Sequence, residues 1–508
     1  MNKLVVVTAL TASLASAAEL YHEQYRPQYH FSPKVNWTND PCGLVFFGGE
    51  YHLFFQFNPL GDLWGHMSWG HAVSPDMLHW RELPVAIPEG PDAMIFTGSS
   101  VVDDHNTSGL CKPGPSCIVS IYTGNTPKSD SRAQRQTQQI TVSQDGRTWA
   151  KYENNPVLDI GMADFRDPKV FWHEPSKQWV MIVVLAREKK ASLYGSANLK
   201  QWKHLSDFGP EGATGGVWEC PDLYQLPVEG SGKSRWVLKI GLNPGHVAGG
   251  SGEQYFVGDF DGTQFHNASP PGEIKWLDYG RDCYCALTWN GESRDRHMIA
   301  WMNNWQYARS IPTAPWRGAM TLPRTLTLRD SGSGIRLLQA PAPAIRSLRG
   351  EKFMFSGSKP ADLNRKIGAW QDLGTTYELE ASISLGAAKK VTWRVLEGSG
   401  QYTLIGYDAV VHQLFVDRTH SGATDFNKDF PSRTVAPLNV ANGELRLHVF
   451  VDRSSVEVFA ADGEVAMTNL IFPNAEDKGI SVQFEGGDPK QLQIQLWNLH
   501  STWKAAKE

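Results

Sequence analysis

The stretch Ser74-Pro75-Asp76-Met77-Leu78-His79-Trp80 decides the fold class, because its polar turn followed by an aromatic residue recurs along the chain. The same four-residue spacing from an acid or amide to an aromatic residue occurs at Asp145–Trp149, Asn198–Trp202 and Asp261–Phe265. The polar positions lie 53 to 69 residues apart. A turn with an aromatic anchor at this interval predicts four-stranded propeller blades. A sandwich with chance turns is the alternative.

Short runs of β-branched and aromatic residues fill the chain between these turns. Residues 51–57, 179–184 and 235–240 are examples, and Gly, Pro, Asn or Asp residues bound such runs. Apolar residues at helical spacing are almost absent. The pattern predicts an all-β protein.

The composition changes near residue 338. Residues 339–344 read Gln-Ala-Pro-Ala-Pro-Ala, which is typical of a stiff linker. Beyond them, residues 377–383 and 445–451 alternate in polarity, as in an antiparallel sandwich. We therefore expect a signal peptide at 1–18, a β-propeller catalytic domain at 19–338, a linker at 339–350 and a β-sandwich domain at 351–508.

The first 18 residues have the features of a secretory signal. Lys3 precedes a short apolar run, and Ala15-Ser16-Ala17 has the small-x-small cleavage pattern. No segment is apolar and long enough to span a bilayer, so we expect a secreted, soluble protein. Asn106, in a loop expected to be exposed, is the best of three glycosylation sequons. The net charge of −5 predicts no binding to nucleic acid or anionic membranes, and the oligomeric state is not predicted.

Six cysteines could form disulfides in an exported protein. Cys111 and Cys117 flank a turn-rich loop, and we expect them to pair. Cys283 and Cys285 would point the same way on one strand, and such neighbours rarely have bridging geometry. The cysteines and histidines show no spacing typical of a metal site, so we expect no metal and no cofactor.

Three acid-centred motifs stand out in the propeller half. They are Asp40 in Trp-Thr-Asn-Asp-Pro-Cys-Gly (37–43), Asp167 in Asp-Phe-Arg-Asp-Pro (164–168) and Glu219 in Trp-Glu-Cys-Pro (218–221). Cleavage of a glycoside with retention needs a carboxylate nucleophile and a carboxylic acid about 5–5.5 Å apart. The three motifs therefore supply candidates for both roles.

The neighbours of each acid in the sequence suggest its role. Asp40 lies among polar turn groups, which suits an ionised nucleophile. Glu219 follows a tryptophan and precedes a cysteine, and poorly solvating neighbours favour the protonated form of an acid. Arg166 should keep Asp167 ionised, and the two could hold sugar hydroxyls. Taken singly, each motif could instead be structural: an Asx-Pro turn, an ion pair or an edge-strand pair.

The order and spacing of these motifs resemble glycoside hydrolase family 32, which contains invertases, inulinases and levanases. Residues 37–43 match five of the seven positions of that family's signature Trp-Met-Asn-Asp-Pro-Asn-Gly. Residues 29–33, 64–71, 301–307 and 452–459 also resemble the family. The resemblance implies a five-bladed β-propeller followed by a C-terminal β-sandwich. It also implies a secreted retaining β-fructofuranosidase that releases fructose from sucrose or from β-fructans such as inulin and levan.

The resemblance also implies which residues contact the substrate. Asp40, Asp167 and Glu219 would be catalytic. The fructose pocket would be lined by Asn39, Gln56, Trp64, Ser99, Arg166 and Trp316. Two residues depart from the family signature: Thr38 replaces Met and Cys42 replaces Asn. Because Asp40 and Glu219 must lie close together, a Cys42–Cys220 disulfide is an alternative pairing.

Three other functions remain open at this level. A fructosyltransferase making short fructo-oligosaccharides would use the same acids with a sugar as acceptor. A non-catalytic fructan-binding propeller would not need all three acids. A hydrolase of arabinan-type furanosides would share the placement of the acids. Chain-length preference, linkage and exo or endo attack depend on loops around the pocket and are not predicted.

Overall fold

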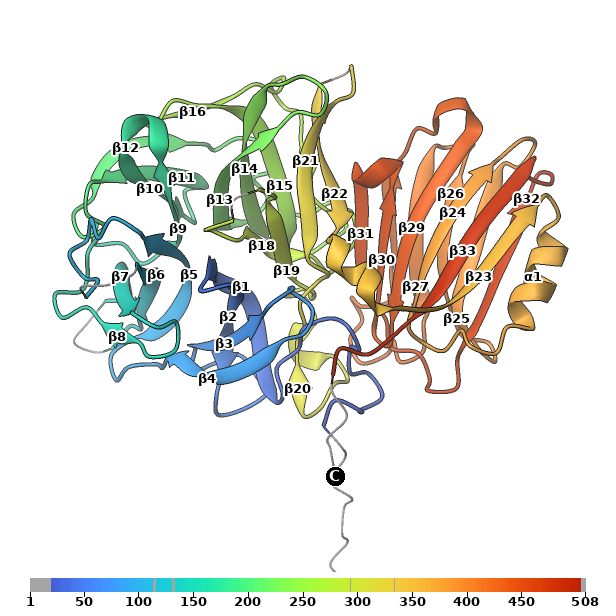
Figure 1. The fold of residues 1–508 in the computed structure, drawn as a ribbon, viewed down its shortest axis with the longest axis horizontal. Helices are drawn as coiled ribbons and strands as arrows, with labels where there is room; N and C mark the ends of the chain where they lie inside the picture. The colour runs from blue at the N-terminus through green and yellow to red at the C-terminus, as the bar shows by residue number, and fades with distance from the viewer. Residues whose placement is uncertain (1–19, 113–115, 130–132, 293, 333, 504–508) are drawn as a thin grey trace, which may run out of the picture.

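The computed structural model describes residues 20–112, 116–129, 133–292, 294–332 and 334–503. The predicted signal peptide at 1–18 therefore lies outside the described residues. Figure 1 shows two β-rich bodies side by side, one with sheets arranged around a centre and one with two facing sheets. None of the helices in the described ranges is both long and apolar enough to cross a membrane.

Within the described residues, the N-terminal body consists of five sheets that form the blades of a propeller. The first blade contains β20 (Trp316–Arg317), β1 (Asn36–Phe47), β2 (Glu50–Asn58), β3 (Ser68–Ser74) and β4 (Arg81–Ile87). The second contains β5 (Met94–Asp103), β6 (Cys117–Thr126), β7 (Arg135–Ser143) and β8 (Ala150–Lys151). The third contains β9 (Phe165–His173), β10 (Gln178–Leu185), β11 (Lys190–Ser196) and β12 (Lys203–Phe208).

The last two blades complete the ring. The fourth contains β13 (Val217–Pro227), β14 (Ser234–Asn243), β15 (Gly252–Phe260), β16 (Phe265–Asn267) and β17 (Lys275–Trp276). The fifth contains β18 (Tyr284–Thr288), β19 (His297–Trp301), β21 (Arg324–Asp330) and β22 (Ile335–Pro341). The first strands of successive blades contact one another, and β18 returns to β1. The expected five-bladed propeller is confirmed.

The recurring polar turn has one structural role. Asp76, Asp145, Asn198 and Asp261 each lie between the third and fourth strands of a blade. In each case one side-chain oxygen accepts hydrogen bonds from the backbone N–H groups two and three residues later. The side chain thus supplies the acceptors that close the turn, so the repeat in the sequence marks the same corner of four blades.

The C-terminal body is the expected β-sandwich. Its first sheet contains β23 (Arg349–Gly357), β33 (Gln491–Leu499), β24 (Tyr377–Ser384), β29 (Glu444–Asp452), β30 (Ser455–Ala460) and β31 (Val465–Leu470). Its second sheet contains β28 (Arg433–Pro437), β27 (Gln413–His420), β26 (Tyr402–Asp408), β25 (Lys390–Glu397) and β32 (Gly479–Glu485). The helix α1 (Pro360–Gly368) packs on β32. Short 3-10 helices are η1 (Glu174–Ser176), η2 (Ala308–Ser310), η3 (Pro343–Leu348), η4 (Ala441–Gly443) and η5 (Ala461–Gly463).

The connection between the two bodies is shorter than the linker expected at 339–350. β22 continues to Pro341, η3 follows it, and β23 begins at Arg349. Despite the prolines at 341 and 343, β22 pairs with β21 as far as Pro341, which lies opposite Arg324. A proline-rich composition is therefore compatible here with the end of a strand and with the first position of a 3-10 helix.

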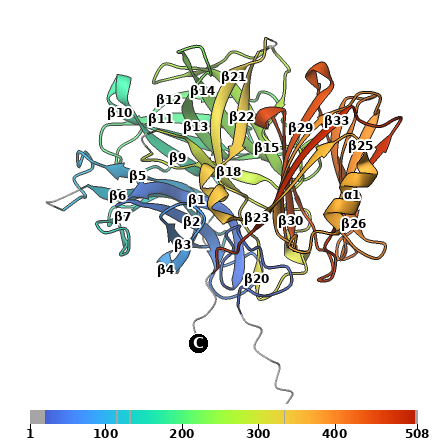
Figure 2. The same ribbon diagram turned by 45° about the vertical axis from the view of Figure 1, so that its right-hand side comes forward.

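Buried ion pairs join the two bodies. Arg324 on β21 is fully buried and contacts Glu457 on β30 at 2.6 Å. Arg418 on β27 contacts Asp282 of the propeller at 2.6 Å. His30, which precedes the first blade, lies between Asp452 and Glu457 of the sandwich. Figure 1 shows β22 of the propeller beside β31 of the sandwich, and Figure 2 shows the two bodies adjoining from a second direction. Because a buried charge without a partner is costly, these pairs require one relative placement of the bodies.

Candidate active site

A cleft of about 240 Å³ lies at the inner strands of the propeller. The side chains that line it come from β1, β2, β5, β9 and β13, from η2, and from the loops that carry Trp64 and Trp305. They are Asn39, Asp40, Gln56, Trp64, Phe96, Thr97, Arg166, Asp167, Glu219, Trp305 and Arg309. The cleft therefore brings together all three acids that the sequence singles out.

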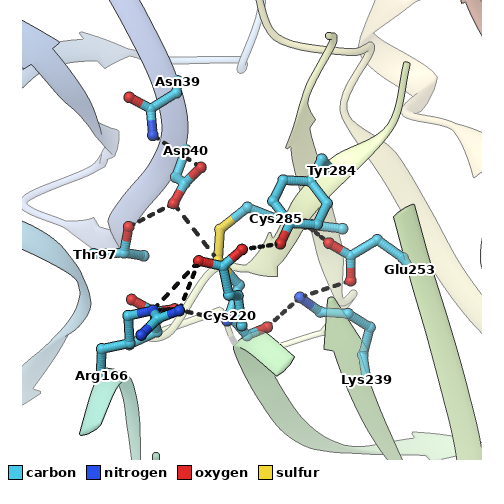
Figure 3. Close-up of a disulfide and its surroundings, with 12 residues drawn as sticks. Asn39, Asp40, Thr97, Arg166, Cys220, Lys239, Glu253, Tyr284 and Cys285 are labelled. Carbon is cyan, nitrogen blue, oxygen red and sulfur yellow. Dashed lines mark hydrogen bonds and ion pairs between the residues drawn. A yellow bond between two sulfur atoms is a disulfide. The ribbon is translucent and has the colours of Figure 1, made fainter. Parts of the chain in front are cut away.

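Asp40 lies on β1 at a break in its pairing with β2, between Thr38 and Pro41. Its Oδ1 accepts a hydrogen bond from Asn39 Nδ2 at 3.0 Å, and its Oδ2 accepts one from Thr97 Oγ1 at 2.7 Å. The Trp37 indole donates to Asn39 Oδ1 at 2.8 Å and so orients that amide with its nitrogen towards Asp40. Figure 3 shows these partners around the carboxylate. Asp40 is therefore held by neighbours on two blades.

Burial governs the ionisation of Asp40 more than its polar neighbours do. Burial raises the pKa of Asp40 to about 6, while the hydrogen bond from Thr97 lowers it and the charge of Glu219 raises it. The expectation that polar turn groups suit an ionised Asp40 did not include this burial, since Asp40 is only 9% exposed. Asp40 is a carboxylate above about pH 6.

Asp167 lines the cleft but is largely buried. Its φ of +64° places it in the left-handed region, and its backbone N–H donates to Thr123 Oγ1 at 3.0 Å. Its Oδ2 accepts a hydrogen bond from the backbone N–H of Cys220 at 2.9 Å. Burial raises the pKa of Asp167 to about 7, and the Arg166 cation lowers it only in part. The expectation that Arg166 keeps Asp167 ionised is therefore wrong below about neutral pH.

Glu219 faces polar groups rather than its sequence neighbours. Arg166 Nη2 contacts its Oε1 at 3.1 Å, and the Tyr284 hydroxyl donates to its Oε2. The Trp218 indole instead lies in the core of its blade, where it donates to Ala213 O at 3.0 Å. Adjacent residues on a strand point to opposite faces, so the apolar neighbours predicted from the sequence do not surround this carboxyl group.

Comparison with known proteins assigns the chain to a family. Residues 30–341 match "Glycosyl hydrolases family 32 N-terminal domain", and residues 344–498 match "Glycosyl hydrolases family 32 C terminal". The chain belongs to glycosyl hydrolase family 32. The resemblance to this family that the acid motifs indicated is thereby confirmed.

The relatives found are similar over most of their length. A levanase of Bacillus subtilis is 44% identical over 99% of this chain and 74% of its own. An extracellular exo-inulinase of Aspergillus awamori is 42% identical over 95% of this chain and 96% of its own. The crystal structure of exo-inulinase from Aspergillus awamori has a TM-score of 0.88 at 39% identity, covering 95% of this chain and 100% of that one. The structure of a β-fructofuranosidase from Schwanniomyces occidentalis complexed with fructosyl-erythritol has a TM-score of 0.85 at 33% identity. It covers 96% of this chain and 99% of that one.

Four of the six predicted binding residues of this family 32 protein line the cleft, and two do not. Asn39, Gln56, Trp64 and Arg166 lie in its wall. The predicted pocket positions of Ser99 and Trp316 are corrected by their contacts. Ser99 Oγ donates to Pro168 O and accepts from Val170 N, both at 2.9 Å, so it braces β5 against β9 beside Asp167. Trp316 is 2% exposed and packs beneath the Arg26 guanidinium, 3.6 Å from the ring centre.

Sequence reasoning missed several residues of the site. Thr97 binds Asp40, and Tyr284 binds Glu219. The wall of the cleft also includes Phe96, Trp305 and Arg309. The stretch Phe96–Ser99 attracted attention for its small residues, but nothing in it identified Thr97 as a partner of Asp40. Tyr284 lies between two cysteines and had no local signal.

The cysteines pair partly as expected. Cys111 and Cys117 form the predicted disulfide. Cys220 is bonded to Cys285, so the alternative Cys42–Cys220 pairing is wrong. Cys42 is a buried free cysteine in a cluster that includes Phe54 and Trp69, and Cys220 belongs to a different cluster. Burial raises the pKa of the Cys42 thiol well above its usual range. Cys42 is therefore a neutral core residue beside the site.

Two groups in the described ranges gather three side chains of metal-ligating type within 4.8 Å. In the first, Asp40 lies beside Cys220 and Cys285, whose sulfurs are joined and cannot act as thiolates. In the second, Glu378 and Glu380 lie beside His448, and Arg349 already binds both glutamates. Neither group offers a free set of ligands for an ion.

Proposed function

We propose that this family 32 chain releases fructose from sucrose and β-fructans through a covalent fructosyl-enzyme, with Asp40 as nucleophile. Its full-length relatives named levanase and exo-inulinase, and its neighbours named fructofuranosidase, support the activity of a β-fructofuranosidase. The observation that carries the residue roles is the cleft, in which Asp40, Asp167 and Glu219 meet with Arg166 between the last two.

The chemistry proceeds in two steps. An Asp40 oxygen attacks the anomeric carbon of the terminal fructosyl unit, while Glu219 donates its proton to the departing glycosidic oxygen. The fructosyl unit is then bound to Asp40 as an ester. Glu219 next accepts a proton from water, which attacks the anomeric carbon and releases fructose and the Asp40 carboxylate. Two inversions give net retention.

The remaining residues hold the sugar. Asp167 and Arg166 bind fructosyl hydroxyls, and the Asp167 carboxylate, when ionised, favours the positive charge that develops on the ring. Gln56 Nε2 is buried in the cleft wall beside the Cys42 thiol, a weak acceptor, and hydrogen-bonds no nitrogen or oxygen of the described residues, so it can donate to a sugar hydroxyl. Trp64, half-buried at the cleft, offers an indole face to a sugar ring.

We also propose that the protein is secreted. The expected signal peptide supports this, and the Aspergillus awamori relative is named extracellular. Detection of a mature chain beginning near residue 19 in the medium tests it. Retention of the full-length chain inside cells would contradict it.

The mechanism is tested with purified protein on sucrose, inulin and levan. Asp40→Asn keeps the size of the side chain and removes the nucleophile, so fructose release should fall at least ~10³-fold. Asp259→Asn, which alters an exposed ion pair on the fourth blade, is the matched control and should retain full activity. Fructose observed by NMR immediately after release should be the β-anomer.

Three outcomes would contradict parts of the proposal. Near-normal activity of Asp40→Asn would exclude Asp40 as nucleophile. First appearance of the α-anomer would exclude retention. Oligosaccharides dominating over free fructose at high sucrose would assign the chain as a fructosyltransferase instead.

A further inference from the structure

A disulfide lies inside the candidate active site. It joins Cys220 on β13 to Cys285 on β18, the inner strands of neighbouring blades, and both residues are at most 2% exposed. The sulfur of Cys220 is 3.6 Å from Asp40 Oδ2. A half-cystine has no S–H proton, so this contact is packing of sulfur against the carboxylate rather than a hydrogen bond. Figure 3 shows the bridge between Asp40 and the Glu253–Lys239 pair.

Both ends of the bridge lie at breaks in strand pairing that orient site residues. The pairing of β13 with β14 shifts after Glu219, and that of β18 with β19 shifts after Tyr284. Cys220 and Cys285 follow directly, with φ of +48° and +47°. This left-handed backbone is unfavourable for a residue with a β-carbon and persists only where its surroundings hold it. Bulges of this kind redirect side chains, here Glu219 and Tyr284.

The backbone on both sides of the bridge is tied to the site as well. The N–H of Cys220 donates to Asp167 Oδ2, and its carbonyl accepts from the Lys239 ammonium. Lys239 contacts Glu253 at 3.2 Å, and Glu253 Oε1 accepts from the N–H of Ala286 at 3.0 Å. A buried ion pair and a covalent bond therefore link the same two bulges. The bond between the Tyr284 hydroxyl and Glu219 spans the same gap.

We propose that the Cys220–Cys285 disulfide is a positioning element for the reaction: it fixes Glu219 and its partner Tyr284 against Asp40 and shields one side of Asp40 from water. This inference rests on the proposed function, since it concerns the geometry of the same acids. The bridge sets the distance between the fourth and fifth blades, which carry Glu219 and Tyr284, and its Cys220 sulfur packs against Asp40 of the first blade.

The second disulfide separates positioning from simple stabilisation. Cys111 and Cys117 are six residues apart at the start of β6, and neither residue lines the cleft that holds the three acids. Removing it should lower stability alone. Removing the bridge in the site should also change the chemistry.

The test compares Cys220→Ala/Cys285→Ala with Cys111→Ala/Cys117→Ala. In the first variant kcat for fructose release should fall about tenfold or more, because small displacements of reacting groups slow catalysis strongly. KM should stay within about twofold, since the sugar-holding side chains remain. Water reaching Asp40 should lower its pKa, so the acidic limb of kcat/KM should move to lower pH. The control should retain the kcat and the pH limb of the wild type.

Each result decides the question. An active wild type whose Cys220→Ala/Cys285→Ala variant keeps kcat and the pH limb would overturn the positioning role. A wild type that releases no fructose would instead contradict the proposed function, and the inference with it. An equal loss of kcat in both double variants would show that the bridge is only a stabilising cross-link, which would also overturn the proposal.

If the variant does not fold, reduction of the wild type replaces it. A water-soluble phosphine takes up the oxygen of water to give its oxide, and its two electrons convert the disulfide to two thiols. Sub-denaturing urea is added if the bridge resists reduction. Activity is measured first, and peptide mass spectrometry after alkylation then gives the reduced fraction of each bridge. Activity should fall in proportion to reduction of Cys220–Cys285, and full activity after its complete reduction would overturn the proposal.

Discussion

At the scale of single residues, burial and hydrogen bonding have opposite effects on the pKa of Asp40. Burial, together with the charge of Glu219, raises the pKa of Asp40 to about 6, while hydrogen bonds from Thr97 and Asn39 stabilise its charged form. A nucleophile must be ionised to attack. The balance between these contributions therefore sets the lowest pH at which the enzyme works.

Thr97→Val tests this balance. Loss of the hydroxyl that donates to Asp40 Oδ2 should raise the pKa of Asp40 further, because the ionised form loses a hydrogen bond. The acidic limb of the kcat/KM profile, near pH 6 in the wild type, should therefore move to higher pH by up to about one unit. Thr141→Val is the matched control, since the buried Thr141 hydroxyl has no hydrogen-bond partner in the described structure. A limb that moves equally in both variants, or in neither, would refute this role of Thr97.

At the scale of elements, the inner strands owe their function to irregularities. β1, β5, β13 and β18 each break register beside a site residue or one of its supports. On β5 the break falls between Ile95 and Gly98, next to Thr97. A β-carbon at Gly98 would lie 2.1 Å from the carbonyl oxygen of Ile121, so only glycine lets β5 approach β6 this closely.

Gly98→Ala should therefore disturb the site through the strand. The added methyl group must push β5 away from β6, which should cost about 1–3 kcal/mol of stability. It should also lower kcat by weakening the Thr97 bond to Asp40 and the Ser99 bond to Pro168. Urea unfolding and initial rates on sucrose measure the two effects. Gly90→Ala is the control, because its nearest non-neighbouring atom would be 3.6 Å away. Normal stability and kcat in Gly98→Ala would show that β5 can move away from β6 without affecting the fold or the site.

At the scale of the whole molecule, the propeller and the sandwich are joined by buried charge. His30 is enclosed by Asp452 and Glu457, and the hydrogen bonds and charges of these acids outweigh burial and raise its pKa to about 9. Because the folded protein binds this proton more tightly than the unfolded chain does, the histidine stabilises the fold fully below about pH 6.5. That stabilisation disappears as the pH rises towards 9.

His30→Gln should remove this pH dependence. The variant should be less stable than the wild type by roughly 2–3 kcal/mol at pH 6 and by much less at pH 9. Thermal unfolding at several pH values between 6 and 9 measures the difference. His266→Gln, which changes an exposed histidine 3.7 Å from Asp261, should leave the wild-type slope unchanged. A constant difference between His30→Gln and wild type across this range would show that His30 does not carry a stabilising charge.

Local patterns were sufficient to predict a propeller followed by a sandwich, and the resemblance to the family supplied the number of blades. The polar turns at Asp76, Asp145, Asn198 and Asp261 act within a few residues, so the sequence shows them directly. Period-2 alternation likewise indicates a half-buried strand wherever it occurs. The three acid motifs and their order sufficed for family membership, and Cys111–Cys117 could be predicted because its loop is short.

What the sequence by itself determined, then, is the five-bladed propeller with its sandwich, the family and the acids that the cleft contains. Only the tertiary structure decided their surroundings: Thr97 on Asp40, Tyr284 and Arg166 on Glu219, and Cys285 as the partner of Cys220. It also removed Ser99 and Trp316 from the pocket. The physical reason is that these contacts cross between blades. They depend on where bulges turn each inner strand and on how closely neighbouring blades pack. No local pattern in the sequence encodes the bulge positions or the blade spacing.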